Sequence, residues 1–303
     1  MPHVLISGGT GYVGRFIVEE ALYEGWDVTV TGRTAPTQDF FSQPVKFIEA
    51  PLDHQADYGG VFAGIDYFIH AAFDHKPGLY RAGEGDDPEG FALRNLGGSA
   101  AMVKAAKAQG VTRVVFLSSR AVYGTQEPGM DLYEHMTARP DTLYGKLKLE
   151  LEQIIEKMTD DDFYGVSLRV TGVYGPAGKG KSHKWESLFE LFSNGLKVKP
   201  RAATEVHGED VARAAILALT TPTERMAGHH VFNVSDYIID HRDILAPLQA
   251  KLKLTHPLPM AGERGQINAM NCDRLKHLGW RCAGPTKFGF TIEALVEAWV
   301  KGR

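Results

Sequence analysis

Short apolar runs alternate along the chain with longer segments that are apolar on one face only. The runs are rich in β-branched residues and nearly continuously apolar, as expected of strands covered on both faces of a sheet. They are HVLIS (3–7), DVTVT (27–31), VKFIEA (45–50), DYFIHAA (66–72), RVVFLSS (113–119) and YGVSLRV (164–170). The pattern predicts a buried sheet formed by the first part of the chain.

The segments between these runs predict helices over residues 12–24, 89–109 and 141–158, where apolar positions recur at helical spacing. Because strands alternate with helices, neighbouring strands should be parallel and joined by right-handed crossovers. The sequence therefore predicts an α/β fold with a Rossmann-type, doubly wound parallel sheet.

The alternation loosens after about residue 172. Beyond a Gly/Lys-rich loop, the pattern predicts helices over residues 185–194, 208–220, 241–252 and 291–301 and a strand over residues 229–235. No Pro/Ser-rich linker or internal repeat divides the sequence. We therefore predict a dinucleotide-binding domain over residues 1–172 and a smaller C-terminal substrate-binding lobe, over residues 173–303, that is partly interleaved with it.

Composition narrows the class of protein. A chain of 303 residues with 44% hydrophobic and 23% charged residues can bury a sizeable core without disulfides. Its net charge of -4 creates no general field for nucleic acid or anionic membranes, so we expect neither as a partner. The two cysteines form no C-x-x-C pair, and no run reaches the roughly 18 apolar residues of a membrane span. These features, with no signal peptide, indicate a cytoplasmic protein.

Three glycines follow the first predicted strand, in VLISGGTGYVGRFIVEEA (4–21). Gly8 suits a tight turn, Gly11 leaves room for a close ligand, and Gly14 allows the next helix to pack on the strand. The N-terminus of that helix offers free N–H groups and a positive dipole end. Together these features favour binding of a dinucleotide pyrophosphate.

The end of the second predicted strand, VTVTGRT, indicates which dinucleotide is bound. An NAD site usually offers an acidic side chain there to the ribose 2′-hydroxyl. This chain has Gly32 followed by Arg33, and Arg15 stands just after the third glycine. Two guanidinium groups and no carboxylate favour a 2′-phosphate, so NADP is predicted over NAD.

A second chemical pattern lies in DTLYGKLKLELEQ (141–153). Tyr144 and Lys148 are four residues apart on a predicted helix and therefore share a face. A cation beside a phenol stabilises the phenolate, which makes the tyrosine a usable proton donor and acceptor. Ser118 and Ser119 end a predicted strand, where ligands bind in sheets of this kind and a hydroxyl can hold a substrate carbonyl.

The order of these motifs resembles the extended short-chain dehydrogenase/reductases, also called the NAD-dependent epimerase/dehydratase family. SGGTGYVG is similar to the T-G-x-x-G-x-x-G turn of that family, FIHAA to its fourth-strand segment, and SSRAVYG and YGKLK to its serine and Y-x-x-x-K segments. NLGGS (95–99), LRVTGVYGP (168–176), VHGEDVARA (206–214) and DRLKHLGW (273–280) resemble further segments of the family.

The resemblance implies roles for individual residues. Tyr144 would be the catalytic acid/base, Lys148 would also bind the nicotinamide ribose, and Ser119 would be the catalytic serine, with Ser118 as the alternative. The implied cofactor-binding residues are Gly8, Thr10, Gly11, Tyr12, Val13, Gly14, Arg15, Arg33, Leu52, Ala71, Ala72, Asn95, Tyr144 and Lys148. The candidate substrate-binding residues are His75, Arg81, Arg120, Lys179 and His207, and no metal is expected because no histidine shows metal-ligand spacing.

Several positions depart from the family pattern. The acid usual before Leu52 is Pro51, and the Asn usual before V-Y-G-P is Gly172. Ser119 is followed by Arg120 and not by the Asp-Glu pair of dehydratases, so dehydration is not expected. Arg201 is displaced from the position at which nucleotide-sugar enzymes place an arginine.

Three functions remain open on these grounds. The favoured one is an NAD(P)-dependent oxidoreductase that moves hydride at a carbonyl or carbinol carbon of a sugar-like substrate, with net reduction or oxidation. The first alternative is a nucleotide-sugar 4-epimerase similar to UDP-glucose 4-epimerase, and the second is a catalytically silent NADP-binding regulatory protein. The family resemblance also implies a homodimer formed through the helix that carries Y-x-x-x-K and the helix before it.

Overall fold

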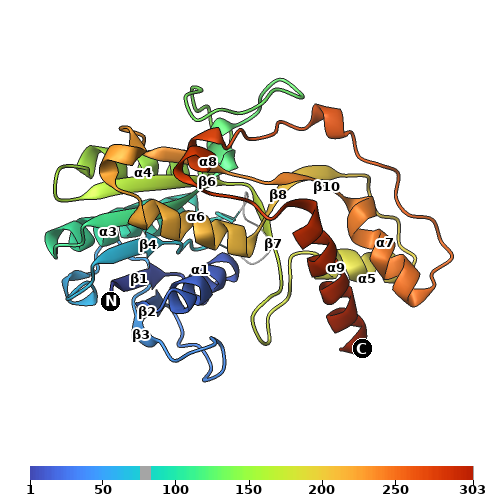
Figure 1. The fold of residues 1–303 in the computed structure, drawn as a ribbon, viewed down its shortest axis with the longest axis horizontal. Helices are drawn as coiled ribbons and strands as arrows, with labels where there is room; N and C mark the ends of the chain where they lie inside the picture. Colours follow the sequence, from blue (N-terminus) through green and yellow to red (C-terminus); the bar gives the residue numbers. More distant parts are fainter. Residues whose placement is uncertain (76–82, 303) are drawn as a thin grey trace.

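A parallel sheet forms the centre of the larger part of the molecule (Figure 1). The computed structural model describes residues 1–75 and 83–302. Within these residues the sheet has seven strands in the order β3-β2-β1-β4-β5-β6-β9, and every neighbouring pair is parallel. The strands are β1 (His3–Ser7), β2 (Asp27–Gly32), β3 (Lys46–Glu49), β4 (Tyr67–His70), β5 (Arg113–Ser119), β6 (Tyr164–Val170) and β9 (Val231–Val234). The predicted Rossmann-type, doubly wound sheet is confirmed.

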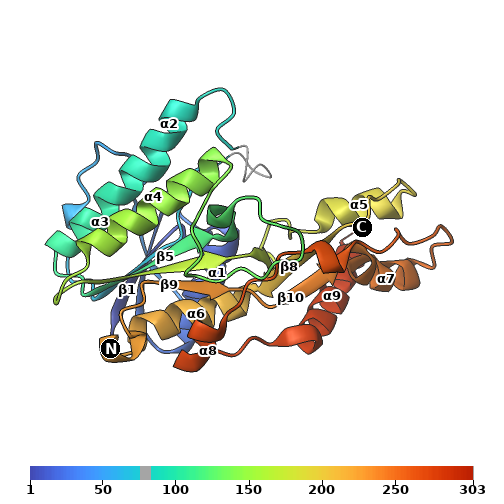
Figure 2. The ribbon, with the colours of Figure 1, turned by 90° about the horizontal axis from the view of Figure 1, so that it is seen from above.

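Helices cover both faces of this sheet, as Figure 2 shows. One face carries α1 (Tyr12–Tyr23) and α6 (Gly208–Thr220), and the other carries α2 (Pro88–Ala92), α3 (Ser99–Ala108) and α4 (Leu143–Met158). Side chains alternate along β1, so Val4 and Ile6 join the core under α1 and α6, whereas Leu5 joins the core under α3 and α4. Such two-sided burial is why these strands are almost entirely apolar.

A smaller lobe lies beside the end of the sheet (Figure 1). Its sheet has the order β10-β8-β7, from β7 (Gly172–Tyr174), β8 (Ala202–His207) and β10 (Tyr237–Asp240). The helices α5 (Glu186–Ser193), α7 (His241–Leu252) and α9 (Gly284–Lys301) share a separate apolar core. The short helix α8 (Asp273–Leu278) packs instead on the core of the larger sheet.

The chain crosses between the two parts more than once. Both β9 and α6 follow residue 172, yet they belong to the larger sheet and its helical layer. The division into residues 1–172 and 173–303 therefore remains a proposal about function and not a description of two separate bodies. Among the described residues, none of the helices combines the length and apolar character needed to span a bilayer.

Candidate active site

The glycine turn brings three elements into contact. Gly8 has a φ of +69°, and a Cβ at this position would lie 2.7 Å from the backbone nitrogen of Ala72, just after β4. A Cβ on Gly14 would collide with the carbonyl of Gly8. Glycine is therefore required at both positions, the first for its left-handed backbone and the second for close packing of α1 on the turn.

The N-terminus of α1 is open toward this turn. Gly11 stands at the N-cap with no side-chain cap, so the first N–H groups of the helix have no partner from a capping side chain. Tyr12 donates its hydroxyl to the carbonyl of Gly175 at 2.7 Å, Val13 packs against the core, and Thr10 lies beside Gly32. An uncapped helix end on a glycine turn fits a pyrophosphate, so the residues present suit a nicotinamide dinucleotide.

The two arginines predicted to bind a 2′-phosphate each have a partner within the protein. Arg15 Nη2 donates to the carbonyl oxygen of Pro176 at 2.8 Å. Arg33 Nη1 donates to Asp74 Oδ1, also at 2.8 Å. Arg33 therefore lies beside a carboxylate, although that carboxylate comes from the end of β4 and not from β2.

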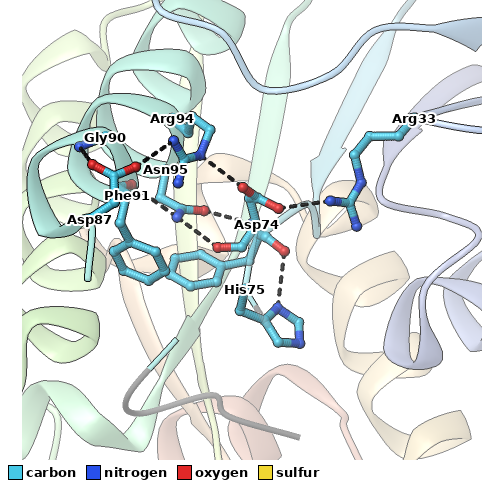
Figure 3. A network of polar contacts seen from close by, with 9 residues as sticks. Arg33, Asp74, His75, Asp87, Gly90, Phe91, Arg94 and Asn95 are labelled. Atoms are coloured by element: carbon cyan, nitrogen blue, oxygen red, sulfur yellow. Dashed lines mark hydrogen bonds and ion pairs between the residues drawn. The ribbon is translucent and has the colours of Figure 1, made fainter. Parts of the chain in front are cut away.

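The segment after β4 is held by a polar network (Figure 3). Asn95 is buried, and its Oδ1 accepts from the backbone N–H of Asp74 at 2.6 Å. Its Nδ2 donates to the carbonyls of Asp74 at 2.8 Å and Phe91 at 3.0 Å. Asn95 lies in a π-helical stretch, Leu93–Gly98, between α2 and α3. The amide that sequence analysis assigns to the cofactor is thus engaged in positioning the loop after β4.

Three hydrophobic positions are predicted to line the cofactor. Leu52 packs against the core under α3, and a Cβ at Gly98 would meet its backbone. Ala71 and Ala72 continue β4 beside the glycine turn. Their roles toward a cofactor stay predictions. The position of Ala71 and Ala72 beside Gly8 supports those of the two alanines, whereas Leu52 follows β3.

Tyr144 and Lys148 lie on α4, against the end of β5. The N-cap Thr142 accepts from the backbone N–H of Gly145 at 3.1 Å and so starts the helix just before the tyrosine. Lys148 Nζ donates to the carbonyl of Leu117 at 2.8 Å, two residues before Ser119. The Phe73 ring meets the Tyr144 ring edge-on with centroids 5.0 Å apart, and its centroid lies 4.5 Å from Lys148 Nζ. The fold thus brings the three predicted catalytic residues to one end of the sheet.

Burial controls the charge of Lys148. Its side chain is enclosed, and this desolvation lowers its pKa to about 7, an effect that the nearby Glu152 carboxylate opposes. The ammonium also lies 4.6 Å from the Phe116 ring centroid and 5.8 Å from that of Tyr144. Aromatic faces and a single carbonyl therefore replace much of the water around this cation.

The two candidate serines have different surroundings. Ser118 is buried and donates to Glu152, which also forms a 2.7 Å ion pair with Arg169. Ser119 is half-buried, and its Oγ accepts from the backbone N–H of Ala121 at 3.1 Å. Ser118 is thus part of a buried network, which favours Ser119 as the serine that meets a substrate.

His70 is a buried residue of the site that sequence analysis did not single out. Its Nδ1 lies 2.6 Å from Ser7 Oγ, and its Nε2 lies 2.7 Å from Ser99 Oγ. Burial lowers its pKa to about 3, so it is neutral. His70 therefore joins β1, β4 and α3 behind the glycine turn, and only its place within FIHAA could have indicated it.

The candidate substrate residues are spread over the molecule. Arg120 Nη2 donates to the carbonyl of Asn268 at 3.3 Å, and both residues line a cavity of about 200 Å³ that also reaches Asp141. His75 Nδ1 lies 3.1 Å from the carbonyl of Phe73. Lys179 is exposed and lies 3.5 Å from Asp39, and Arg81 falls outside the described residues.

His207 serves as a packing and capping group in this structure. Its buried ring meets Phe16 and Tyr174 edge-on, with centroids 5.8 and 5.2 Å away. Its Nδ1 accepts from the backbone N–H of Glu209 at 3.2 Å and caps α6, and burial lowers its pKa. In the described part of the chain, no group of three or more histidine, cysteine or acidic side chains is arranged to hold a metal ion.

Comparison with known proteins identifies a matching family and proteins of similar sequence. The model of the NAD dependent epimerase/dehydratase family matches residues 4–235. UDP-glucose 4-epimerase of Bacillus subtilis is 30% identical over 177 residues, covering 54% of this chain and 50% of that protein. UDP-glucose 4-epimerase of Bos taurus is 25% identical over 326 residues, covering 92% of each. The chain thus aligns with half the length of the first relative and with most of the second.

Solved structures show the same fold. UDP-N-acetylglucosamine 4-epimerase from Methanobrevibacter ruminantium, in complex with UDP-N-acetylmuramic acid, superposes with a TM-score of 0.81 at 20% identity, covering 100% of this chain and 99% of that one. UDP-glucuronic acid 4-epimerase from Bacillus cereus, in complex with NAD, gives a TM-score of 0.78 at 18% identity, covering 99% of each chain.

Proposed function

Because the chain belongs to the NAD-dependent epimerase/dehydratase family of enzymes, we propose that it is a nucleotide-sugar 4-epimerase. The observation that carries the proposal is that Tyr144 and Lys148 lie on α4 against the end of β5, the strand that ends at Ser119. Sequence analysis favours net reduction or oxidation, whereas the named activities of the relatives support epimerisation. We therefore place epimerisation first.

The residues of the glycine turn would hold the dinucleotide, with its pyrophosphate at the N-terminus of α1. When bound, this group supplies the acceptor and donor of hydride at the sugar carbon. The chain itself supplies the phosphate-binding N–H groups, the ribose-binding Lys148 and the apolar positions Leu52, Ala71 and Ala72. It also restricts water around Lys148, whose ammonium is buried among aromatic rings.

Proton transfer falls to Tyr144. Oxidation of a carbinol to a ketone removes one proton from the hydroxyl oxygen, and reduction returns one to it. The Tyr144 phenolate would take that proton and give it back, with the ammonium of Lys148 stabilising the phenolate by its charge. Ser119 would hold the same oxygen by a hydrogen bond. The cavity lined by Arg120, Asp141 and Asn268 offers polar groups to sugar hydroxyls.

Conversion of UDP-sugars tests this proposal directly. The purified protein is incubated with UDP-glucose or UDP-N-acetylglucosamine, and the 4-epimers are separated by chromatography. We expect interconversion with no net change in nicotinamide absorbance. Nicotinamide binding without conversion of any UDP-hexose, UDP-N-acetylhexosamine or UDP-hexuronate would contradict the proposal.

A net reductase that exchanges NADPH is the second candidate. The observation that favours it is the absence of a carboxylate at Gly32, followed directly by Arg33. In that case NADPH would be consumed in proportion to a carbonyl substrate, and the purified protein would contain no retained nucleotide. Tightly retained NAD, released only on denaturation, would instead support the epimerase.

A further inference from the structure

The carboxylate of Asp74 lies between two guanidinium groups (Figure 3). Asp74 Oδ1 accepts from Arg33 Nη1 at 2.8 Å, and Asp74 Oδ2 accepts from Arg94 Nε at 2.9 Å. Arg33 follows β2 and Asp74 follows β4, and these strands flank β1 in the sheet. Their side chains therefore meet across the end of β1, where the glycine turn begins.

Asp74 is held more firmly than Arg33. Both backbone polar groups of Asp74 are bonded to the buried amide of Asn95. Arg94 is fixed on its far side by Asp87, with Nη1 and Oδ2 3.1 Å apart. The Asp74 side chain is 27% exposed and that of Arg33 is 72% exposed. The carboxylate thus has a defined place, and the arginine is the partner that can adjust.

The bond to Asp74 makes Arg33 a weaker partner for a phosphate group of a cofactor. A phosphate that bonds to Arg33 shares one guanidinium with Asp74, within the roughly 4–6 Å at which like charges oppose each other. A phosphate monoester carries about -1.5 to -2 charges near neutrality, so the repulsion is substantial. A ribose 2′-hydroxyl is uncharged and can donate a hydrogen bond to the carboxylate.

We propose that Asp74 determines cofactor choice, supplying from the end of β4 the carboxylate that β2 lacks at Gly32 and so selecting NAD over NADP. The inference rests on the proposed function insofar as a nicotinamide dinucleotide must bind at the glycine turn. It reverses the preference that Arg15 and Arg33 predict from sequence, because both guanidinium groups already have acceptors within the protein.

Equilibrium dialysis of the whole protein, freed beforehand of any retained nucleotide, against equal concentrations of NAD and NADP measures this choice without any sugar substrate. The wild type is expected to bind mainly NAD. Asp74→Asn keeps the shape of the side chain but removes its charge, and should raise the ratio of bound NADP to bound NAD at least about tenfold. The shift should shrink in high salt, because the groups are partly exposed.

Asp87→Asn is the matched control. It removes one carboxylate from the same network but touches Arg94 and not Arg33, so the ratio should stay near that of the wild type. Adding Arg33→Ala to Asp74→Asn should abolish the gain in NADP, since the freed guanidinium is what binds the phosphate. Thermal unfolding checks that each variant is folded, and Asp74→Ser provides a second uncharged variant.

The outcomes separate this inference from the proposed function. If the wild type binds NAD but Asp74→Asn leaves the ratio of bound NADP to bound NAD unchanged or lowers it, the role of Asp74 is overturned and the proposed function is not. An equal rise of this ratio in Asp87→Asn also overturns the role of Asp74, because the net charge of the network would then account for the effect. Binding of neither nucleotide overturns both the inference and the proposed function.

Discussion

The buried ammonium of Lys148 connects the helix that carries Tyr144 to the strand that ends at Ser119. Its bond to the Leu117 carbonyl and its contact with the Phe73 ring place charge, phenol and hydroxyl at one end of the sheet. Sequence spacing predicts that Tyr144 and Lys148 share a helix face. It does not predict Phe73, since an aromatic side chain after a strand carries no signal of its own.

The phenol of Tyr144 is the group on which turnover should depend. Tyr144→Phe deletes the proton donor and leaves the ring that packs against Phe73. We expect turnover to fall by roughly 10² to 10⁴, with nicotinamide affinity nearly unchanged. Epimerisation assays and equilibrium dialysis measure the two effects. Tyr133→Phe, at a partly exposed tyrosine before α4, is the control, and a variant at 144 that keeps a tenth of the activity would refute the role.

His70 should make the protein less stable in acid. Its pKa is about 3 in the folded chain and 6.5 without the burial that lowers it, so below pH 6.5 the unfolded chain binds a proton that the folded chain does not. The groups that face the ring are Ser7, Ser99, Phe68, Phe116 and, by its charge, Lys148, and among these no carboxylate stabilises the protonated form.

The test of His70 compares urea unfolding at pH 7 and pH 5. The wild type should lose about 2 kcal/mol more unfolding free energy over this interval than His70→Gln, which cannot titrate. The variant can be less stable at both pH values, because the prediction concerns only the difference between them. Parallel losses in the two proteins would show that His70 is not the titrating group.

At the scale of elements, α4 is attached to the sheet by a buried ion pair. Glu152 and Arg169 have side chains 4% and 6% exposed, and Arg169 also lies over the Tyr123 ring with its Cζ 4.8 Å from the centroid. Ser118 adds a third member from β5. The pair therefore joins α4, β5 and β6 immediately behind the catalytic residues.

Removal of one partner of this ion pair should lower the free energy of unfolding more than replacement of both partners. Glu152→Gln leaves a buried guanidinium without its counter-ion and is expected to lower the free energy of unfolding by about 3–5 kcal/mol. The double variant Glu152→Leu with Arg169→Met should lose less than Glu152→Gln alone. Chemical denaturation measures both, with Glu150→Gln, on the exposed side of α4, as the control. A double variant that is the least stable of all would contradict the argument.

Regular elements follow the hydrophobic pattern closely, and irregular ones do not. The predicted strands at 113–119 and 164–170 coincide with β5 and β6, and the helix at 208–220 coincides with α6. The predicted helix at 89–109 is divided by the π-helical stretch at 93–98, which no periodicity reveals. Sequence analysis did not predict β7, β8 and β10. The strands β7 and β10 have only three and four residues, and β8 (AATEVH) lacks the nearly continuous apolar run of the predicted strands.

The candidate site was predictable where chemistry depends on local spacing. The glycine turn and the Tyr144–Lys148 pair belong to this class. The Arg33–Asp74 pair could not be predicted from local spacing. Its two residues are 41 positions apart in the sequence and meet only because β2 and β4 flank β1. Sequence analysis therefore assigned Arg33 to a phosphate without seeing its carboxylate neighbour.

For the whole molecule, the homodimer implied by the family remains a prediction. On α3 and α4, Ala101, Ala105 and Ile154 are only partly buried, and the two helices lie side by side on one face (Figure 2). Pairing of this face with a second copy would bury them. Sedimentation should give a dimer at micromolar concentration and a monomer for Ile154→Glu. Leu191→Glu, on the exposed face of α5, should stay dimeric, and a monomeric wild type would exclude the dimer.

The position of β9 late in the sequence affects how the chain folds during synthesis. The strand beside β6 is supplied by residues 231–234, and α1 packs against α6, which begins at residue 208. A nascent chain that ends at residue 172 therefore has an unpaired β6 edge and an uncovered α1, features that invite aggregation. We expect a fragment of residues 1–172 to be insoluble or chaperone-bound when expressed alone, which fractionation of cell extracts would show. A soluble, cooperatively unfolding fragment would mean that the edge is protected in some other way.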